Sequence, residues 1–149
     1  MRISKEARQS LLRVSAKDYE LEANRIALKG TVILGSKMGY TGKGVFVVED
    51  IARVLDEVNV YRVAMGKTAV PCLISEAELV GRTGDAKYQE KVFRLEFSIS
   101  PRSPPMAQAK FYCALSEYAN ALGVKLKQTR VYLEFDYDVT VLKAKIRKD

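Results

Sequence analysis

Histidine and tryptophan are both absent from this chain of 149 residues, and cysteine occurs only twice. The lack of histidine excludes Ser-His-Asp and Cys-His mechanisms and histidine-ligated zinc, and it removes the commonest general base at neutral pH. No apolar run approaches the ~20 residues that a membrane-spanning helix needs. The first residues are too polar for the apolar segment of a signal peptide. We therefore expect a cytoplasmic protein with no membrane partner.

The two cysteines, Cys72 and Cys113, lie in apolar surroundings and have no Cys-x-x-Cys spacing. They give no support to a zinc site or a thioredoxin-like motif. Both are predicted to be buried free thiols that pack as small hydrophobic side chains in a reducing compartment. The sequence leaves open whether the fold brings them together.

The composition is that of a globular protein, with 48% hydrophobic residues, 29% charged residues, 9 Gly and 4 Pro. A chain of this size and composition can bury a sizeable core. No repeat, low-complexity linker or shift in composition divides it. We therefore expect residues 1–149 to form a single globular domain.

The formal net charge of +7 is concentrated at the two ends. Residues 1–13 and residues 141–149 each hold four basic residues against one acidic residue. Clustered basic groups can neutralise phosphates and give salt-sensitive binding to nucleic acids. Terminal charges also serve solubility alone, so this pattern favours a nucleic-acid partner without requiring one.

Alternation of apolar and polar residues predicts strands over residues 91–100 and 131–141. Residues 31–34 are β-branched or apolar, lie between glycines and are also typical of a strand. Two further strands are predicted at 60–65 and 68–80. Pro71 lacks a backbone donor, which places the second of these at a sheet edge or a bulge.

Three segments in the first 60 residues show helical signals. Residues 4–13 form one predicted helix, with Ser4 as its N-cap. A second begins near Val47, and its apolar residues recur at helical spacing as far as Val58. Residues 18–28 fit both a strand and a helix, and we favour a helix there.

A further helix is predicted over residues 104–122. Ser103 is expected to cap it, and Pro104 to occupy the first position, where a missing amide hydrogen costs nothing. Gly123 is expected to end it. The predicted fold class is α+β: a two-layer sandwich with a mostly antiparallel sheet of about four to six strands and two or three helices on one face.

The most loop-like segment, residues 35–44, combines four glycines with two lysines and no acidic residue. A loop between a strand and a helix can bind an anion through backbone amides. Lys37 and Lys43 would supply charge there, and Tyr40 a face on which a base can stack. A flexible surface connection is the simpler interpretation.

Two further segments carry charge that a phosphate could meet. Arg102 lies among prolines, directly before the helix predicted over residues 104–122, and a rigid connection is the alternative explanation. The C-terminal basic residues are predicted to contact nucleic acid together with it: Lys143, Lys145, Arg147 and Lys148.

An acidic row, Glu134, Asp136 and Asp138, falls at alternate positions of the predicted last strand. Three carboxylates on one sheet face can bind Mg²⁺ or Mn²⁺. The solvated face of an amphipathic strand is the more common case, and Arg94 on another strand could pair with it. No metal site is therefore predicted, although the sequence leaves one open.

The sequence thus favours a small, basic, non-catalytic nucleic-acid-binding protein that contacts mainly phosphates and needs no cofactor. DNA and RNA are not distinguished. One alternative is a homo-oligomeric interaction or assembly module. A second is a metal-dependent enzyme that uses the acidic row, which the absence of histidine makes less favoured.

Overall fold

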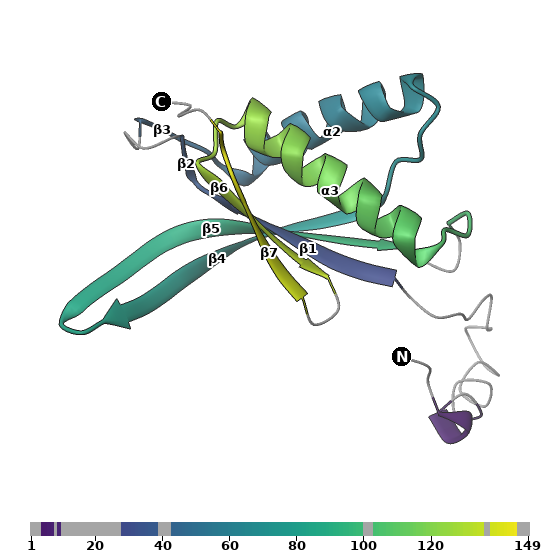
Figure 1. Cartoon of the computed structure of the whole chain (residues 1–149), viewed down its shortest axis with the longest axis horizontal. Coiled ribbons are helices and arrows are strands. Elements are labelled where there is room, and N and C mark those ends of the chain that lie inside the picture. Colours follow the sequence, from purple (N-terminus) through teal and green to yellow (C-terminus); the bar gives the residue numbers. More distant parts are fainter. Residues whose placement is uncertain are drawn as a thin grey trace.

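The computed structural model describes residues 4–7, 9, 28–38, 43–99, 103–135 and 138–145. It is an α+β fold built on a five-stranded antiparallel sheet with the order β4-β5-β1-β6-β7. Two long helices, α2 and α3, cover one face of this sheet (Figure 1). The predicted fold class is therefore confirmed.

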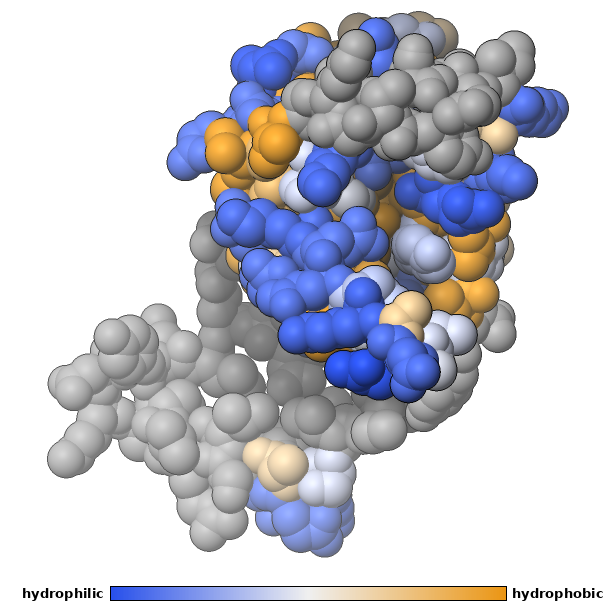
Figure 2. Space-filling view, turned by 90° about the vertical axis from the view of Figure 1, so that its left-hand side faces the viewer, coloured by the Kyte–Doolittle hydropathy of each residue, from blue (hydrophilic) through white to orange (hydrophobic). Residues whose placement is uncertain are grey.

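The longest strands form a hairpin, β4 (Cys72–Thr83) and β5 (Ala86–Ile99). Gly84 has a positive φ of 60° in the tight turn between them, a conformation that glycine adopts without strain. The hairpin projects well beyond the rest of the sheet (Figure 1). Seen from the side towards which it points, hydrophilic surface lies in front, with hydrophobic patches between (Figure 2). Pro71 directly precedes the edge strand β4, as its missing donor requires.

The centre of the sheet is β1 (Leu28–Gly35), which pairs with β5 on one side and β6 on the other. The predicted strand over residues 131–141 is wrong, because the chain turns back as a hairpin of β6 (Arg130–Phe135) and β7 (Asp138–Lys143). Both arms alternate in polarity, so the pattern alone does not reveal the turn.

The segment predicted as a flexible loop contains a small second sheet. β2 (Lys37–Met38) pairs with β3 (Lys43–Val45), and the Phe46 amide donates to the Ser36 carbonyl at 2.7 Å. Residues 39–42 lie outside the described part of the chain. The ambiguous segment 18–28 also lies outside it, except for Leu28 in β1.

Helix α2 (Val48–Ala64) is longer than expected, and the predicted strand over residues 60–65 is wrong. The Val47 amide donates to the Asp50 carboxylate at 2.9 Å, which fixes the start of the helix. Val58 and Arg62, four residues apart, both face the core, so burial continues along the helix to its end.

At the N-terminus of the chain, Ser4 Oγ accepts a hydrogen bond from the Ala7 amide at 3.1 Å, as expected of an N-cap.

Helix α3 spans Gln108–Lys125, with Ala107 as its N-cap and Leu126 as its C-cap. The predicted start at Ser103 and Pro104 and the predicted end at Gly123 are therefore wrong. Gly123 lies inside the helix, and a Cβ there would come within 3.0 Å of Val131 Cγ2. The glycine serves close packing of the helix on β6 rather than chain termination.

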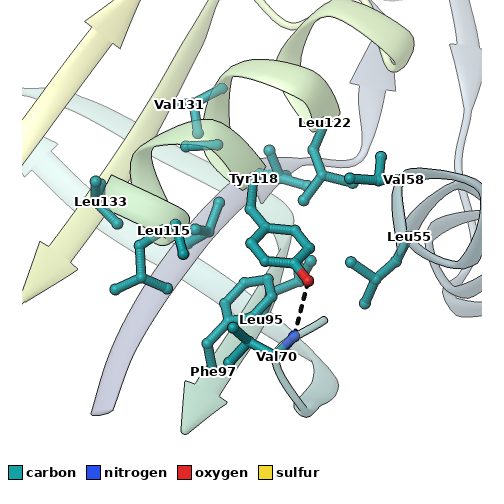
Figure 3. Packing of buried hydrophobic residues seen from close by; sticks show 14 of the residues in the cluster. Leu55, Val58, Val70, Leu95, Phe97, Leu115, Tyr118, Leu122, Val131 and Leu133 are labelled. Carbon is teal, nitrogen blue, oxygen red and sulfur yellow. Dashed lines mark hydrogen bonds between the residues drawn. The ribbon is translucent and has the colours of Figure 1, made fainter. Parts of the chain in front are cut away.

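The core fills the space between the two helices and one sheet face (Figure 3). Phe97 of β5 and Tyr118 of α3 are fully buried, with ring centroids 4.6 Å apart. The Tyr118 hydroxyl accepts a hydrogen bond from the Val70 amide at 2.9 Å and donates to Asn59 Oδ1 at 2.5 Å. One side chain thus joins α3, α2 and the segment that leads into β4.

A buried arginine reinforces this junction. Arg62 is only 6% exposed, and its guanidinium stacks on the Tyr118 ring at 4.6 Å from the centroid. It also bonds Glu117 Oε1 at 2.9 Å and the Thr68 carbonyl at 3.0 Å. Lys67 pairs with the other oxygen of the same carboxylate at 2.6 Å.

Within the described part of the chain, no helix is long and apolar enough to cross a membrane.

Candidate functional site

The sheet face opposite the helices carries three rows of side chains across neighbouring strands. One row is Ala77, Val92 and Gly35. The second is Ser75, Arg94, Ile33, Tyr132 and Val141, and the third is Leu73, Glu96, Thr31, Glu134 and Val139. We call this side of the sheet the open face.

The surface is recessed over the first row because two of its three residues are small. Gly35 has no side chain and Ala77 a single methyl group, so the taller side chains of the next row stand above them. The result is a groove of about 830 Å³. It extends from the start of β6 across β1 and β5 to the hairpin, and we call it the sheet groove.

The floor of the sheet groove is apolar. Val92 is only 7% exposed although it points away from the helices, and Ile33 beside it is half-buried. Leu79 borders the groove at the hairpin. A concave apolar floor is the part of a small-molecule site that removes a flat or aliphatic group from water.

Charged side chains of both signs surround this floor. Lys37, Arg94 and Arg130 supply positive charge, and the acids on the lining are Glu78, Glu90 and Glu134. Among the described residues, Lys37, Arg130, Glu90 and Glu134 form no ion pair. Unpaired charges of both signs around an apolar floor suit a ligand that itself carries both signs.

Arg94 has a partner on its own strand. Its guanidinium meets Glu96 at 3.1 Å, so it does not pair with the acidic row as one of our hypotheses had it. Only Glu134 of that row can be placed on the open face, because Asp136 lies outside the described residues and Asp138 belongs to a different strand. The part of the chain that the structure describes holds no group of three potential metal-ligating side chains.

A buried amide holds one end of the groove in shape. Gln128 is 6% exposed, and its Oε1 accepts a hydrogen bond from the Gly35 amide at 2.8 Å. Its Nε2 donates to the carbonyl of Lys37 at 3.1 Å and to that of Leu126 at 3.3 Å. The end of α3 is therefore tied to the end of β1 and the start of β2, where Lys37 stands at the rim.

The predicted nucleic-acid contacts do not come together in one site. Lys37 borders the sheet groove, whereas Lys143 and Lys145 line a separate hollow between β7 and α3. Lys43 lies in β3. The remaining predicted contacts, Tyr40, Arg102, Arg147 and Lys148, lie outside the described residues.

Sequence reasoning missed the groove residues Glu90, Gln128, Arg130 and Tyr132. Alternation along β6 already placed Arg130 and Tyr132 on the polar face of a strand. The hollow itself depends on which small residues of three strands become neighbours. The pairing register that decides this cannot be deduced from any single segment.

The cysteines differ from the sequence prediction. Cys113 is exposed on α3, and Cys72 is only half-buried in β4, so neither is a fully buried core residue. Partial burial, with the nearby Glu96 charge, raises the pKa of the Cys72 thiol to about 12. Neither cysteine borders the sheet groove.

No protein-family model matches the sequence, and no curated protein matches it either. The fold, however, is similar to that of a phage SAM lyase in complex with S-methyl-5'-thioadenosine, with a TM-score of 0.61 and 14% identity. That match covers 84% of this chain and 95% of the lyase. A phage SAM lyase in the apo state matches with a TM-score of 0.62 and 16% identity, over 85% of this chain and 98% of the lyase.

These findings correct the predicted function. A non-catalytic, basic nucleic-acid-binding protein is contradicted, because the fold is shared over nearly the whole length of an enzyme. Net charge at the chain ends says little about a site whose own lining is balanced between acidic and basic residues.

Proposed function

We propose that this protein is a lyase that cleaves SAM (S-adenosylmethionine) and releases S-methyl-5'-thioadenosine, with the sheet groove as its active site. The observation that carries the proposal is the groove itself, an apolar floor ringed by unpaired charges of both signs. The shared fold supports it, since the similar phage enzyme is a SAM lyase seen with S-methyl-5'-thioadenosine.

The groove suits such a substrate in size and polarity. Its volume of about 830 Å³ lies within the range of roughly 300–1,000 Å³ that is usual for small-molecule sites. SAM joins a flat adenine to a sulfonium cation and an amino acid that carries one charge of each sign. Val92 and Ala77 offer the adenine an apolar surface, and the Tyr132 ring offers a cation an electron-rich face.

The chemistry also suits an apolar floor. When the bond between sulfur and the four-carbon amino-acid chain breaks, its electron pair stays on sulfur and the sulfonium becomes a neutral thioether. Positive charge on sulfur therefore disappears as the reaction proceeds. Water stabilises the charged sulfonium more than the neutral thioether. A site that shields the sulfonium from water therefore favours the reaction.

Two balanced routes lead to the released thioether. In the first, a carboxylate oxygen of the substrate forms the new bond to the carbon that sulfur leaves, which gives a cyclic ester and needs no protein base. In the second, a base removes a proton from the neighbouring carbon, which gives an alkene. Glu90 and Glu134 are the carboxylates at the groove that could accept it.

The test is to incubate the purified protein with SAM and to follow S-methyl-5'-thioadenosine by chromatography and mass spectrometry. The cyclic ester and the alkene amino acid are isomers of equal mass, so NMR rather than mass identifies the four-carbon product and thereby the route. Release that requires the protein supports the proposal. A protein that folds but releases no thioether above the uncatalysed background contradicts it.

A matched pair of variants ties the activity to the groove. Ala77→Leu places a larger side chain on the groove floor, and we expect it to reduce kcat/KM at least tenfold with little change in melting temperature. Leu73→Ala, on the same strand and face but outside the groove, is the control and should retain activity. Equal activity of both variants would place the active site elsewhere.

Assembly into homo-oligomers stays a prediction from the sequence. Multi-angle light scattering tests it directly against the monomer mass of 16.7 kDa.

A further inference from the structure

The first strand after α3 presents a cation, an aromatic ring and an anion in one line along the groove. Arg130, Tyr132 and Glu134 are alternate residues of β6, so all three point to the open face. Their Cα atoms follow one another at about 6.7 Å, so about 13 Å separates the Cα atoms of Arg130 and Glu134. No other strand of the sheet lines the groove with this sequence of groups.

Neither charge is neutralised by the protein. Arg130 and Glu134 have no ion pair among the described residues, although each is on the groove lining. Both side chains are long enough to lean towards each other over Tyr132, which would bring a guanidinium and a carboxylate to either side of a small zwitterion. Lys37 lies at the rim and adds positive charge to the groove.

We propose that Arg130 and Glu134 bind the amino-acid end of the substrate, Arg130 its carboxylate and Glu134 its ammonium group. This inference rests on the proposed function and specifies how that substrate lies. With the amino acid over β6, the sulfonium lies over Ile33 of β1. The adenine then reaches Val92 and Arg94 of β5, about 10 Å away across two strand spacings.

This orientation predicts which part of the ligand each residue recognises. Arg130 contributes only when a ligand carries the carboxylate, and Glu134 only when it carries the ammonium group. S-Methyl-5'-thioadenosine has neither group, so it should bind through the apolar floor alone. The product lacks the contacts that hold the substrate, which favours its release after cleavage.

The experiment measures dissociation constants by calorimetry for three ligands. None of them has both the sulfonium and the carboxylate that the first route requires. S-Adenosylhomocysteine carries both amino-acid charges, decarboxylated SAM carries only the ammonium group, and S-methyl-5'-thioadenosine carries neither. Arg130→Gln should weaken binding of the first about tenfold to a hundredfold, as expected for a lost charge-assisted hydrogen bond, and leave the other two unchanged.

Glu134→Gln should weaken binding of the first two ligands by a similar factor and leave S-methyl-5'-thioadenosine unchanged. Lys143→Gln, which removes the basic residue opposite Arg130 on β7, is the matched control for charge, and Glu76→Gln is the control for acid loss. Neither residue lines the groove, and neither substitution should change any of the three constants by more than about twofold.

The outcomes separate the two proposals. If the unaltered protein releases thioether from SAM but Arg130→Gln weakens all three ligands equally, or none, the orientation is wrong and the lyase proposal stands. If the unaltered protein neither cleaves SAM nor binds any of the three ligands, both proposals fail.

Discussion

The two faces of the sheet are built from the same strands, yet they differ in what fills them. On the helix-covered face, Leu95, Phe97 and their neighbours are large, apolar and closed over by α2 and α3. On the open face, small residues lie beside long charged ones and nothing among the described residues covers them. Alternate positions of one chain segment thus serve stability on one side and recognition on the other.

The comparison implies that substitutions on the two faces have different consequences. Changes on the covered face should be felt in folding, because close-packed interiors tolerate neither cavities nor unpaired polar groups. Changes in the sheet groove should be felt in ligand binding with little change in stability.

Phe97→Asp should have the largest effect, because it places a carboxylate at a fully buried position against Tyr118. We expect it to reduce the free energy of unfolding by roughly 4 kcal/mol or more, enough to unfold much of the population. Urea denaturation followed by circular dichroism measures this. The matched control is Ser75→Asp on the open face opposite Arg94, which should change stability by less than about 0.5 kcal/mol.

Tyr118→Phe removes only a hydroxyl from the covered face. The Val70 amide then loses its acceptor and Asn59 Oδ1 loses its donor, so we expect a loss of about 1–3 kcal/mol in the free energy of unfolding. Tyr61→Phe, on the exposed side of α2, is the control and should be neutral. An unchanged melting temperature in Tyr118→Phe would mean that these two hydrogen bonds contribute nothing to the stability of the covered face.

Glu117 should make stability depend on pH in the acid range. Its hydrogen bonds with Lys67 and Arg62 hold the pKa of its carboxyl below the ordinary value of 4.5. The stabilisation is fully present above that value and is lost as the pH falls through the lower pKa of the folded state. The stability difference between the unaltered protein and Glu117→Gln should therefore shrink as the pH is lowered from 5 to 3. A difference that stays constant over this range would contradict the assigned pairing.

The two thiols should differ sharply in their reactivity with an alkylating agent, and this prediction involves the smallest change in stability. Iodoacetamide at pH 8 should modify the exposed Cys113 and spare Cys72, whose pKa of about 12 keeps it protonated. Mass spectrometry of the intact protein should show a single adduct. Cys113→Ser should show none in the same time, and rapid labelling of Cys72 in that variant would mean that the edge strand β4 opens readily.

Local pattern was enough for the elements whose polarity repeats without interruption. The alternation around Phe93, Leu95 and Phe97 predicted both the strand and the face that is buried. It failed where two solutions share one pattern. The hairpin of β6 and β7 alternates as a single long strand would, and the last turns of α2 contain the β-branched residues typical of a strand.

The candidate site was less accessible to sequence reasoning than the fold. The sequence predicts roles for Lys37, Arg94 and Glu134, but as parts of an anion-binding loop and an acidic row rather than of one groove. The order of charges along the chain does not reveal the site, because recognition depends on which charges become neighbours in space. The sequence predicts a loop from Gly35, whereas the structure places this residue at the end of β1. Because glycine has no side chain, it leaves space beside Val92 there.

Local sequence sets three features: the alternation that gives the sheet one apolar and one polar face, the amphipathic helices that cover the apolar one, and the exclusion of histidine chemistry. Each of these follows from residue type and spacing within a short segment. The tertiary structure alone decided that Ala77, Val92 and Gly35 lie side by side, and that Arg130 and Glu134 face the same groove. A groove exists only when strands distant in the sequence are paired in one register, and hydrogen bonding between strands sets that register.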